Sequence, residues 1–379
     1  MPAADGSCEP MSRREEEVDA RVSSTTSNAE IGRNPHRPGG LRQHGSVFVV
    51  ATSRRWSNIA VDATPRIRTH GARNGGYRGF PAGPLVLIIV NPAAAGGRVG
   101  REWPETSQRL AAWGLDLPAV LTEAPGHATE LAAQAVADGV RRIAVAGGDG
   151  SVCEAAEGLH RAGDGELAIL PLGTGNDAAR TLGVPSDLET AARTAANGRS
   201  RTVDLIRVGD RLALNAIGVG LIGDINDRAA RIKWVRGMAV YFMAALSALF
   251  RYRTQTVRVT TGDTDYEGTM LILAVHNGPT TGGGFALTPN AAPDDGLLDA
   301  CLVQEVGPAG RLARLLAAMR GTLGTKAGTL ELRAPWLELH FSEPVPAHLD
   351  GNSVVLEPPV VRFEVVPRAL QVVVPESEE

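Results

Sequence analysis

The chain has 379 residues, of which 43% are hydrophobic and 21% are charged, as in ordinary globular proteins with enough apolar material for a core. Its formal net charge of −4 is too small to indicate a nucleic-acid binder. The three cysteines are scattered, so they predict neither a disulfide framework nor a zinc site. The first residues contain no apolar stretch like that of a signal peptide, and we therefore expect a cytoplasmic protein.

Residues 1–83 differ in composition from the rest of the chain. They are rich in serine, arginine, glycine and proline, and they end in a stretch typical of a linker. One short apolar patch, Ser46–Thr52, has the composition of a strand, but no neighbouring element is predicted beside it. We expect residues 1–83 to form a disordered extension.

A regular alternation of strand and helix patterns begins at residue 84. Strands are predicted at residues 85–90, 118–122, 141–147 and 167–173. Helices are predicted at residues 103–113, 126–139 and 151–163, and a further helix begins near residue 174. This alternation predicts an α/β domain over residues 84–203, with a parallel sheet and helices on both faces.

The pattern changes after residue 203. Short strands with alternating hydrophobicity follow one another between turns that contain proline and glycine. Two helix-like runs interrupt them, at residues 228–252 and 307–323. We therefore expect a β-rich, mostly antiparallel second domain over residues 204–375.

Three loops of the first domain share one design. They are NPAAAGGR (Asn91–Arg98), GGDGS (Gly147–Ser151) and PLGTGND (Pro171–Asp177), and each follows a predicted strand. In a parallel sheet such loops gather at the carboxyl edge, where glycine lets backbone N–H groups approach a phosphate. Asp149, inside the second loop, would repel a bare phosphate. Its presence indicates either that it holds Mg²⁺ bound to a nucleotide or that it accepts a proton from a hydroxyl.

One glycine-rich loop alone is usually no more than a turn, so the argument depends on the three loops together. The chain contains no P-loop sequence. GVGLIG (Gly218–Gly223) matches the G-x-G-x-x-G pattern of dinucleotide-binding folds, but it lacks the acidic residue that should close a second strand about 20 positions later. We interpret this match as chance or as close packing.

The sequences GGDGS, LAILPLGTGNDAAR and NPAAAGGR resemble the catalytic domain of diacylglycerol kinases and of their bacterial lipid-kinase relatives. Residues 276–303 resemble the glycine-rich stretch and the P-x-A-x-x-x-DG-x-L segment of the same family. The resemblance spans about residues 84–375. It implies a two-domain kinase with a fold of the NAD-kinase and diacylglycerol-kinase type and with ATP in the cleft.

The resemblance also implies which residues form the site. The nucleotide-binding residues would be Asn91, Pro92, Gly96, Gly97, Thr122, Gly147, Gly148, Asp149, Gly150, Ser151, Gly173, Thr174, Gly175, Asn176 and Asp177. A structural Mg²⁺ would be bound by the carboxylate of Asp295 and the carbonyl groups of Ala292 and Leu297, although a simple turn at residues 294–296 explains the segment equally well. The catalytic residues would be Asp149, Asp350 and Asn352.

Asn352 departs from the family pattern. Relatives carry Asp-Gly-Glu, whose glutamate is the suspected proton acceptor, whereas this chain reads HLDGNSV at residues 348–354. An amide takes up no proton near neutral pH, and the loss of a general base typically lowers a rate on the order of 10²–10⁴-fold. Either Asp149, Asp350 or a water substitutes for the glutamate, or the protein binds nucleotide without efficient turnover.

We therefore expect an ATP-dependent lipid kinase that requires Mg²⁺ and phosphorylates a lipid hydroxyl such as that of diacylglycerol. Two alternatives remain: a kinase for a soluble acceptor, of the NAD-kinase type, and a catalytically impaired nucleotide-binding protein.

The expected partner is a lipid substrate presented by a membrane, which the protein contacts peripherally at the inner membrane face. No nucleic-acid partner is expected. Whether the protein forms a homodimer is left open. The run Trp234–Phe250 is either an interfacial helix or, as we favour, a core helix with arginines at its ends. His127 is expected in a turn, and His276 either lines the cleft or is an ordinary strand residue.

Overall fold

The computed structural model describes residues 49–50, 86–231, 243–244, 247–248 and 251–376. Most of the expected extension and most of the run Trp234–Phe250 lie outside the described residues. Within the extension, Val49–Val50 (β1) pairs antiparallel with β18 (Asn352–Leu356), inside the segment Ser46–Thr52 that has a strand-like composition. In the described part of the chain, no helix is both long and apolar enough to span a bilayer.

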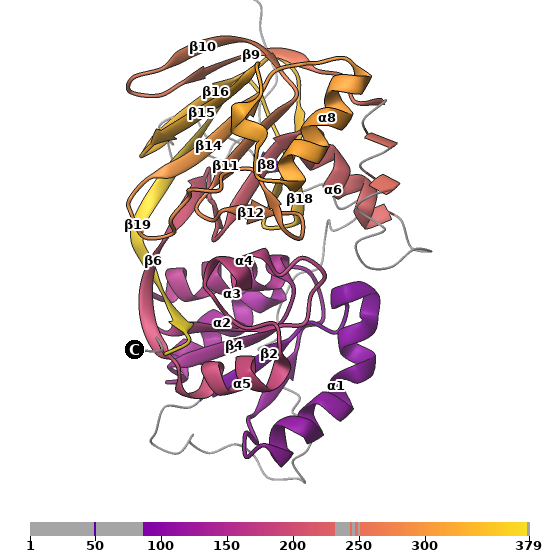
Figure 1. The fold of residues 1–379 in the computed structure, drawn as a ribbon. Helices are drawn as coiled ribbons and strands as arrows, with labels where there is room; N and C mark the ends of the chain where they lie inside the picture. Colours follow the sequence, from indigo (N-terminus) through magenta and orange to yellow (C-terminus); the bar gives the residue numbers. More distant parts are fainter. Residues whose placement is uncertain (1–48, 51–85, 232–242, 245–246, 249–250, 377–379) are drawn as a thin grey trace, which may run out of the picture. The chain divides into compact units, whose positions relative to one another are not determined.

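The first domain is an α/β fold with a parallel sheet (Figure 1). Its elements are β2 (Val86–Val90), α1 (Ala94–Ala112), β3 (Ala119–Leu121), α2 (His127–Ala137), β4 (Arg142–Gly147), α3 (Asp149–Ala162), β5 (Glu166–Pro171), α4 (Asp177–Thr181) and α5 (Leu188–Asn197). The strands lie in the order β3-β2-β4-β5, and each neighbouring pair is parallel. The predicted α/β architecture is confirmed. The range of α1 begins nine residues before the predicted one, but Ala95, Gly96 and Gly97 have left-handed backbone angles, so the continuous helix begins only after these three residues.

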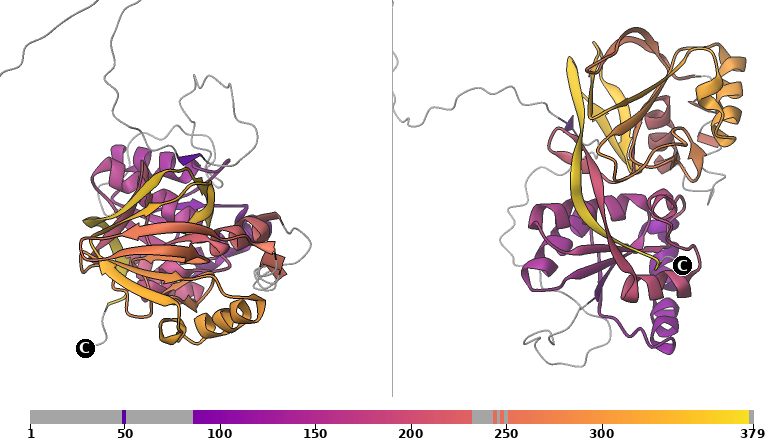
Figure 2. Two further views of the ribbon diagram at one scale, coloured as in Figure 1. Left: turned by 90° about the horizontal axis from the view of Figure 1, so that it is seen from above. Right: turned by 60° about the vertical axis from the view of Figure 1, so that its left-hand side comes forward.

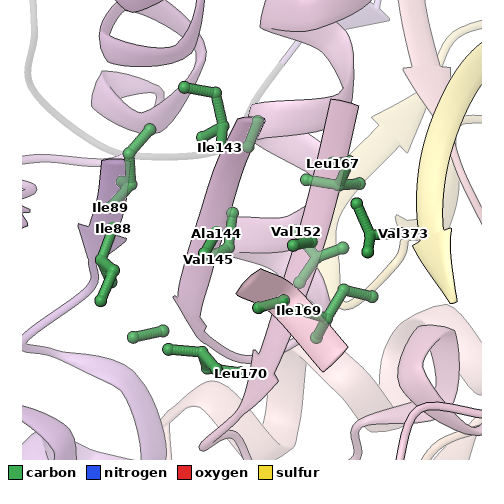
Figure 3. Packing of buried hydrophobic residues seen from close by; sticks show 14 of the residues in the cluster. Ile88, Ile89, Ile143, Ala144, Val145, Val152, Leu167, Ile169, Leu170 and Val373 are labelled. Carbon is green, nitrogen blue, oxygen red and sulfur yellow. The ribbon is translucent and has the colours of Figure 1, made fainter. Parts of the chain in front are cut away.

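The strands of this sheet are continuous apolar runs because both faces of the sheet are covered. Ile88 of β2 is 1% exposed, and Ile143 of β4 and Leu167 of β5 are completely buried. Figure 3 shows these side chains packed with Val152 of α3 and Val373, which comes from the other end of the chain. This packing fixes where each strand ends, and therefore where the following loop begins.

The second domain is built mainly from antiparallel strands, as predicted. Its elements are β7 (Arg211–Ala213), β8 (Ala216–Gly220), α6 (Leu221–Arg231), β9 (Gln255–Thr260), β10 (Asp265–Met270), β11 (Ile272–His276), β12 (Thr280–Thr281), β13 (Phe285–Ala286), β14 (Leu298–Val303), α8 (Pro308–Met319), the 3₁₀ turn η1 (Leu323–Thr325), β15 (Thr329–Ala334), β16 (Trp336–His340), β17 (Val345–Leu349) and β18. One sheet has the order β1-β18-β17-β8-β11-β14-β15. A single apolar cluster joins this sheet to β9, β16 and their neighbours in the other large sheet.

Two long strands connect the domains. They are β6 (Arg199–Val208) and β19 (Val360–Val374), which pair antiparallel and are drawn as the long curved ribbons in Figure 2. One end of β19 pairs with β16 in the second domain, and the other end pairs parallel with β5 in the first. The predicted boundary near residue 203 falls inside β6, so both domains share this strand pair.

The segment GVGLIG forms the turn from β8 into α6, but its glycines are explained by packing. A Cβ on Gly218 would lie 2.4 Å from Nε2 of His348, and one on Gly223 would lie 2.4 Å from the carbonyl oxygen of Pro346. Gly220 has a φ of +84°, in the left-handed region. Strand β17 therefore approaches too closely for larger residues, which supports the packing interpretation over dinucleotide binding.

Candidate functional site

The three glycine-rich loops lie next to one another at the carboxyl edge of the parallel sheet. They follow β2, β4 and β5, which are adjacent and parallel, so they leave the sheet on the same side. Asn91 of the first loop donates a hydrogen bond through Nδ2 to Oγ of Ser151 at 2.7 Å. The second and third loops touch as well, since a Cβ on Gly173 would lie 2.3 Å from Cα of Gly148.

The first loop turns sharply before the main part of α1. Ala95, Gly96 and Gly97 have φ values of 50°, 66° and 78°, a left-handed run in which glycine is strongly favoured. Oδ1 of Asn91 accepts a hydrogen bond from the backbone N–H of Ala93 at 2.9 Å. Pro92 packs against α1, because its Cβ and carbonyl oxygen each lie 2.8 Å from where a Cβ on Gly100 would be. Pro92 therefore stabilises the first loop by packing against α1.

The glycines of the second and third loops lie where neighbouring side chains leave no room. A Cβ on Gly147 would lie 3.0 Å from Oγ of Ser151. A Cβ on Gly150 would lie 2.6 Å from Oδ1 of Asn352, and one on Gly175 would lie 2.8 Å from Oδ2 of Asp149. These glycines are required by close contacts among the predicted site residues themselves.

The side chain of Asn176 forms hydrogen bonds within the third loop. Its φ of 54° is left-handed, and its Nδ2 donates to the carbonyl oxygens of Pro171 at 3.0 Å and Gly173 at 3.3 Å. Thr174, at the centre of this loop, is half-buried. The side chain of Asn176 thus stabilises the shape of the third loop.

Asp149 begins α3 and reaches across to the third loop. Its Oδ1 accepts a hydrogen bond from the backbone N–H of Ala178 at 2.9 Å. Burial raises the pKa of Asp149 to about 6, and the negative charge of Asp177 adds to the rise. The side chain is therefore ionised at neutral pH but close to its titration range, which suits either a metal-binding carboxylate or a proton acceptor.

The side chain of Asp177 links the two domains through hydrogen bonds. It begins α4 and is 4% exposed, and its Oδ1 pairs with the guanidinium of Arg180 at 2.5 Å. Thr280 donates through Oγ1 to the same oxygen at 3.0 Å, and the backbone N–H of Gly283 donates to Oδ2 at 2.6 Å. Both carboxylate oxygens are thus engaged within the protein. This arrangement supports a positioning role for Asp177 rather than direct metal ligation.

Asp350 is held by the main chain of the second domain. Its carboxylate accepts hydrogen bonds from the backbone N–H groups of Leu214 at 2.6 Å, Asn215 at 3.1 Å and Ala216 at 2.7 Å. Burial nevertheless raises its pKa to about 7, and the charge of Asp149 contributes to the rise. Because its oxygens are occupied, Asp350 orders the end of β17 and places a negative charge near Asp149.

Asn352 begins β18 and contacts the first turn of α3. Its Nδ2 donates to the carbonyl oxygen of Gly150 at 3.2 Å, so β18 touches the GGDGS loop directly. The structure therefore brings Asn352 into contact with Gly150, the residue that follows Asp149 in the chain. The side chain at position 352 is an amide.

A pocket of ≈ 120 Å³ extends from this acidic region into the second domain. Its polar end is formed by Asp149, Gly175, Asp177, His348 and Asp350. The rest of the lining is largely apolar and comes from side chains of α6, β11, β13, α8 and η1, among them Leu221, Ile222, Ile225, Ile272, Phe285, Leu287, Leu315 and Leu323. Asn226 of α6 and Arg311 and Arg314 of α8 also line the pocket. The pocket thus joins a charged region to an apolar one.

The remaining predicted nucleotide residue and the histidines have simpler surroundings. Thr122 is 9% exposed, and its backbone N–H donates to the carbonyl oxygen of Val90 at the edge of the sheet. Nδ1 of His127 accepts a hydrogen bond from the backbone N–H of Glu123 at 3.0 Å, as expected for a turn residue. His276 is completely buried and contacts Oγ1 of Thr288 at 2.8 Å, so it is a strand residue and does not line the pocket.

The predicted metal loop between β13 and β14 is held by arginines. Asp295 accepts a hydrogen bond from the backbone N–H of Leu297 at 3.0 Å and forms an ion pair with Arg333. A cation bound by Asp295, Leu297 and the carbonyl group of Ala292 would have to compete with the guanidinium group. Among the described residues, no three or more His, Cys, Asp or Glu side chains are grouped as a metal site. The pairing favours the simple turn over a bound metal.

Several residues that the sequence motifs did not predict contact the candidate site. Arg180, three residues after Asp177 on α4, had a detectable signal, since oppositely charged residues at this spacing pair on a helix. Thr280, Gly283 and Asn215 had none, because their contacts join segments far apart in sequence. Asn215 accepts from Oγ1 of Thr181 at 2.6 Å and thus forms a second link between the domains.

Both domains match known sequence families. Residues 85–208 match the diacylglycerol kinase catalytic domain. Residues 215–374 match the YegS C-terminal NAD kinase beta sandwich-like domain.

Relatives of similar length cover both domains. The chain is 35% identical over 293 residues to "Probable lipid kinase YegS-like" of Pseudomonas aeruginosa, which is 76% of this chain and 94% of the relative. It is 33% identical over 270 residues to the protein of the same name from Pseudomonas putida, covering 70% of this chain and 88% of the relative.

Solved structures agree with these matches. The crystal structure of a diacylglycerol kinase from Bacillus anthracis str. Sterne has a TM-score of 0.58 at 26% identity, covering 77% of this chain and 97% of that chain. Another crystal structure from this organism has a TM-score of 0.63 at 27% identity, with the same coverage. With the convergent loops, the pocket and both domain matches in place, the chain belongs to the family of YegS-like lipid kinases, which carry the diacylglycerol kinase catalytic domain.

Proposed function

We propose that this protein is an ATP-dependent lipid kinase that transfers the γ-phosphoryl group to a hydroxyl group of a lipid such as diacylglycerol. The observation that carries the proposal is the pocket that joins Asp149 and Asp350 to an apolar interior. Phosphoryl transfer needs the charged end, and an acyl chain needs the apolar end. A soluble acceptor such as NAD has no use for an apolar interior of this kind.

The loops supply the nucleotide-binding part of the proposed site. The left-handed turn at Gly96 and Gly97, the start of α3 at Gly148–Ser151 and the backbone around Thr174 all present main-chain groups without bulky side chains. Such backbone N–H groups, together with the N-terminus of α3, stabilise phosphate charge. The close contacts between the loops keep these groups in place before ATP binds, so little ordering is required on binding.

Asp149 is the residue that would hold Mg²⁺. Carboxylate oxygen is a preferred ligand of this cation, and Oδ2 of Asp149 lies against Gly175 at the polar end of the pocket. Mg²⁺, when bound, would neutralise phosphate charge as it develops during transfer. Asp177 and Asp350 support Asp149, since one fixes the third loop and the other the end of β17.

During the reaction the lipid hydroxyl oxygen bonds to the γ-phosphorus, the bond from phosphorus to the bridging oxygen breaks, and ADP leaves. The hydroxyl proton must move to a base. Asn352 accepts no proton, and the oxygens of Asp350 are engaged by backbone donors. A water near Asp149 is therefore the proposed acceptor, because a carboxylate that holds Mg²⁺ is a poor base. The pKa of about 6 leaves Asp149 ionised at neutral pH and thus able to hold the cation.

One observation favours a second candidate function. Asn352 stands beside Asp149 where relatives have a glutamate, which would leave a nucleotide-binding protein with slow or no turnover. The two candidates share the ATP site and differ only in the chemical step.

The test is incubation of the purified protein with γ-labelled ATP, Mg²⁺ and a mixed lipid extract. We expect label in the organic phase, its transfer to diacylglycerol when that lipid is supplied alone, and its loss in Asp149→Asn. Label on NAD and on no lipid would reverse the choice of acceptor. ATP binding without any labelled product would favour the nucleotide-binding protein, and no binding of ATP–Mg²⁺ at millimolar concentrations would contradict both candidates.

A further inference from the structure

The exposed large apolar side chains of the described residues gather on one helix. They are Leu312, Leu316 and Met319, which are 47%, 42% and 59% exposed and lie on α8. Their spacing of four and three residues places them on one face of two successive turns. Because soluble surfaces usually scatter such residues, a concentrated apolar face indicates a binding surface.

This face is continuous with the lining of the pocket. Leu315 and Ala318, on the neighbouring side of the same helix, line the apolar end of the pocket. Helix α8 therefore has one side against the proposed acyl site and another side against solvent.

The charged residues around α8 indicate which kind of partner its apolar face binds. Between Glu305 and Glu331 the sequence contains Arg311, Arg314, Arg320 and Lys326 and no acidic residue, although the whole chain has a net charge of −4. Arg320, which directly follows Met319 in the chain, and Lys326, at the end of η1, are both exposed. Apolar residues flanked by cations match a surface that is apolar inside and negatively charged outside.

We propose that the α8 face (Leu312, Leu316 and Met319, with Arg320 and Lys326) docks onto an anionic membrane and places the pocket at the lipid surface. This inference builds on the proposed lipid substrate, but membrane binding needs neither ATP nor turnover. A protein that binds vesicles without phosphorylating lipid would therefore refute the kinase proposal alone.

The test is co-sedimentation of the full chain with vesicles of phosphatidylcholine, with and without phosphatidylglycerol, in the absence of ATP. We expect binding that increases with phosphatidylglycerol and decreases with salt. Replacing Leu316 and Met319 together by Gln should weaken binding roughly tenfold or more, because exposed apolar area is lost. Arg320→Gln should weaken binding about fivefold, and only on anionic vesicles.

Two matched variants control for general effects. Arg193→Gln makes the same charge change on an exposed position of α5 and should leave binding unchanged. Met319→Leu keeps the apolar surface and should bind like the wild type. Unchanged binding of the Leu316→Gln, Met319→Gln double variant would overturn the proposal. So would a wild-type dimer in solution that this double variant converts to monomer, since the face would then belong to a second copy of the chain.

Discussion

The side-chain amide of Asn352 donates a hydrogen bond to the carbonyl oxygen of Gly150, which lies 3.2 Å away and 202 residues earlier in the chain. This bond ties β18 to the first turn of α3, next to Asp149. A residue of the second domain thus reaches the GGDGS loop of the first domain.

Asn352→Glu should increase the rate of lipid phosphorylation. A carboxylate has no hydrogen to donate to the carbonyl of Gly150, so it would turn away from that oxygen, and it adds a proton acceptor near Asp149. We expect kcat to rise roughly 10²-fold, within the range for a general base, with little change in KM for ATP. Steady-state kinetics with diacylglycerol checks this. Asn352→Gln keeps the length of the new side chain without its charge, and equal rates for both variants would argue against a missing base.

The activity should decrease as the pH falls through about 6. Burial and the charge of Asp177 raise the pKa of Asp149 to about 6, above that of an ordinary aspartate, so the ionised form that would hold Mg²⁺ is lost as the pH falls through this value. A pH–rate profile measures the midpoint directly.

Asp149→Asn should lower kcat on the order of 10²–10⁴-fold and remove the acidic limb of this profile. Asp138→Asn, at the exposed end of α2, is the matched control and should retain both rate and profile. Persistence of the acidic limb in Asp149→Asn would assign that titration to another group.

Gly173→Ala should weaken ATP binding. The added Cβ would lie 2.3 Å from Cα of Gly148, so the second and third loops would have to separate. Because main-chain atoms form this contact, no side chain can rotate to relieve it. Equilibrium titration with ATP–Mg²⁺ is the measurement, and we expect at least roughly tenfold weaker binding because the phosphate-binding groups lose their arrangement.

Gly262→Ala is the control for a change of glycine to alanine. Gly262 lies between β9 and β10, and its added Cβ would meet nothing within 4 Å. ATP affinity equal to that of the wild type in both variants would show that the contact between Gly148 and Gly173 does not shape the nucleotide site.

Removal of divalent metal should leave the thermal stability of the nucleotide-free protein unchanged. Arg333 already pairs with Asp295 in the loop where a structural Mg²⁺ was expected, so no cation is needed there. Differential scanning calorimetry with and without a chelator checks this. In Arg333→Gln the carboxylate is freed, and Mg²⁺ should then raise Tm. A decrease in the Tm of the wild-type protein on chelation would instead support the metal site.

The sequence predicted the first domain well, because the evidence it needed is local. Apolar runs such as Val86–Val90 identify buried strands, and alternation with helices places the following loops at one edge. The convergence of Asn91, Asp149 and Asp177 follows from that alternation. Local patterns also explain why GGDGS and PLGTGND were expected at the same edge of the sheet, where the structure places them.

The rest depends on contacts between distant segments, which a sequence pattern does not encode. Asp177 is fixed by Thr280 and Gly283, 103 and 106 residues later. Asp350 is fixed by backbone groups about 135 residues earlier, and these groups carry no side-chain signal at all. The apolar pattern of β19 predicted a strand but not its partner, so its return to β5 was not foreseen.

That return of β19 affects how the protein is made. The first 200 residues contain all three glycine-rich loops, yet the edge of β5 stays uncovered until Gln371 and Val372 have been synthesised. The first domain therefore completes its sheet only at the end of translation, and until then the edge of β5 stays unpaired. A nascent chain stalled before β19 should be a better client for chaperones than the released protein.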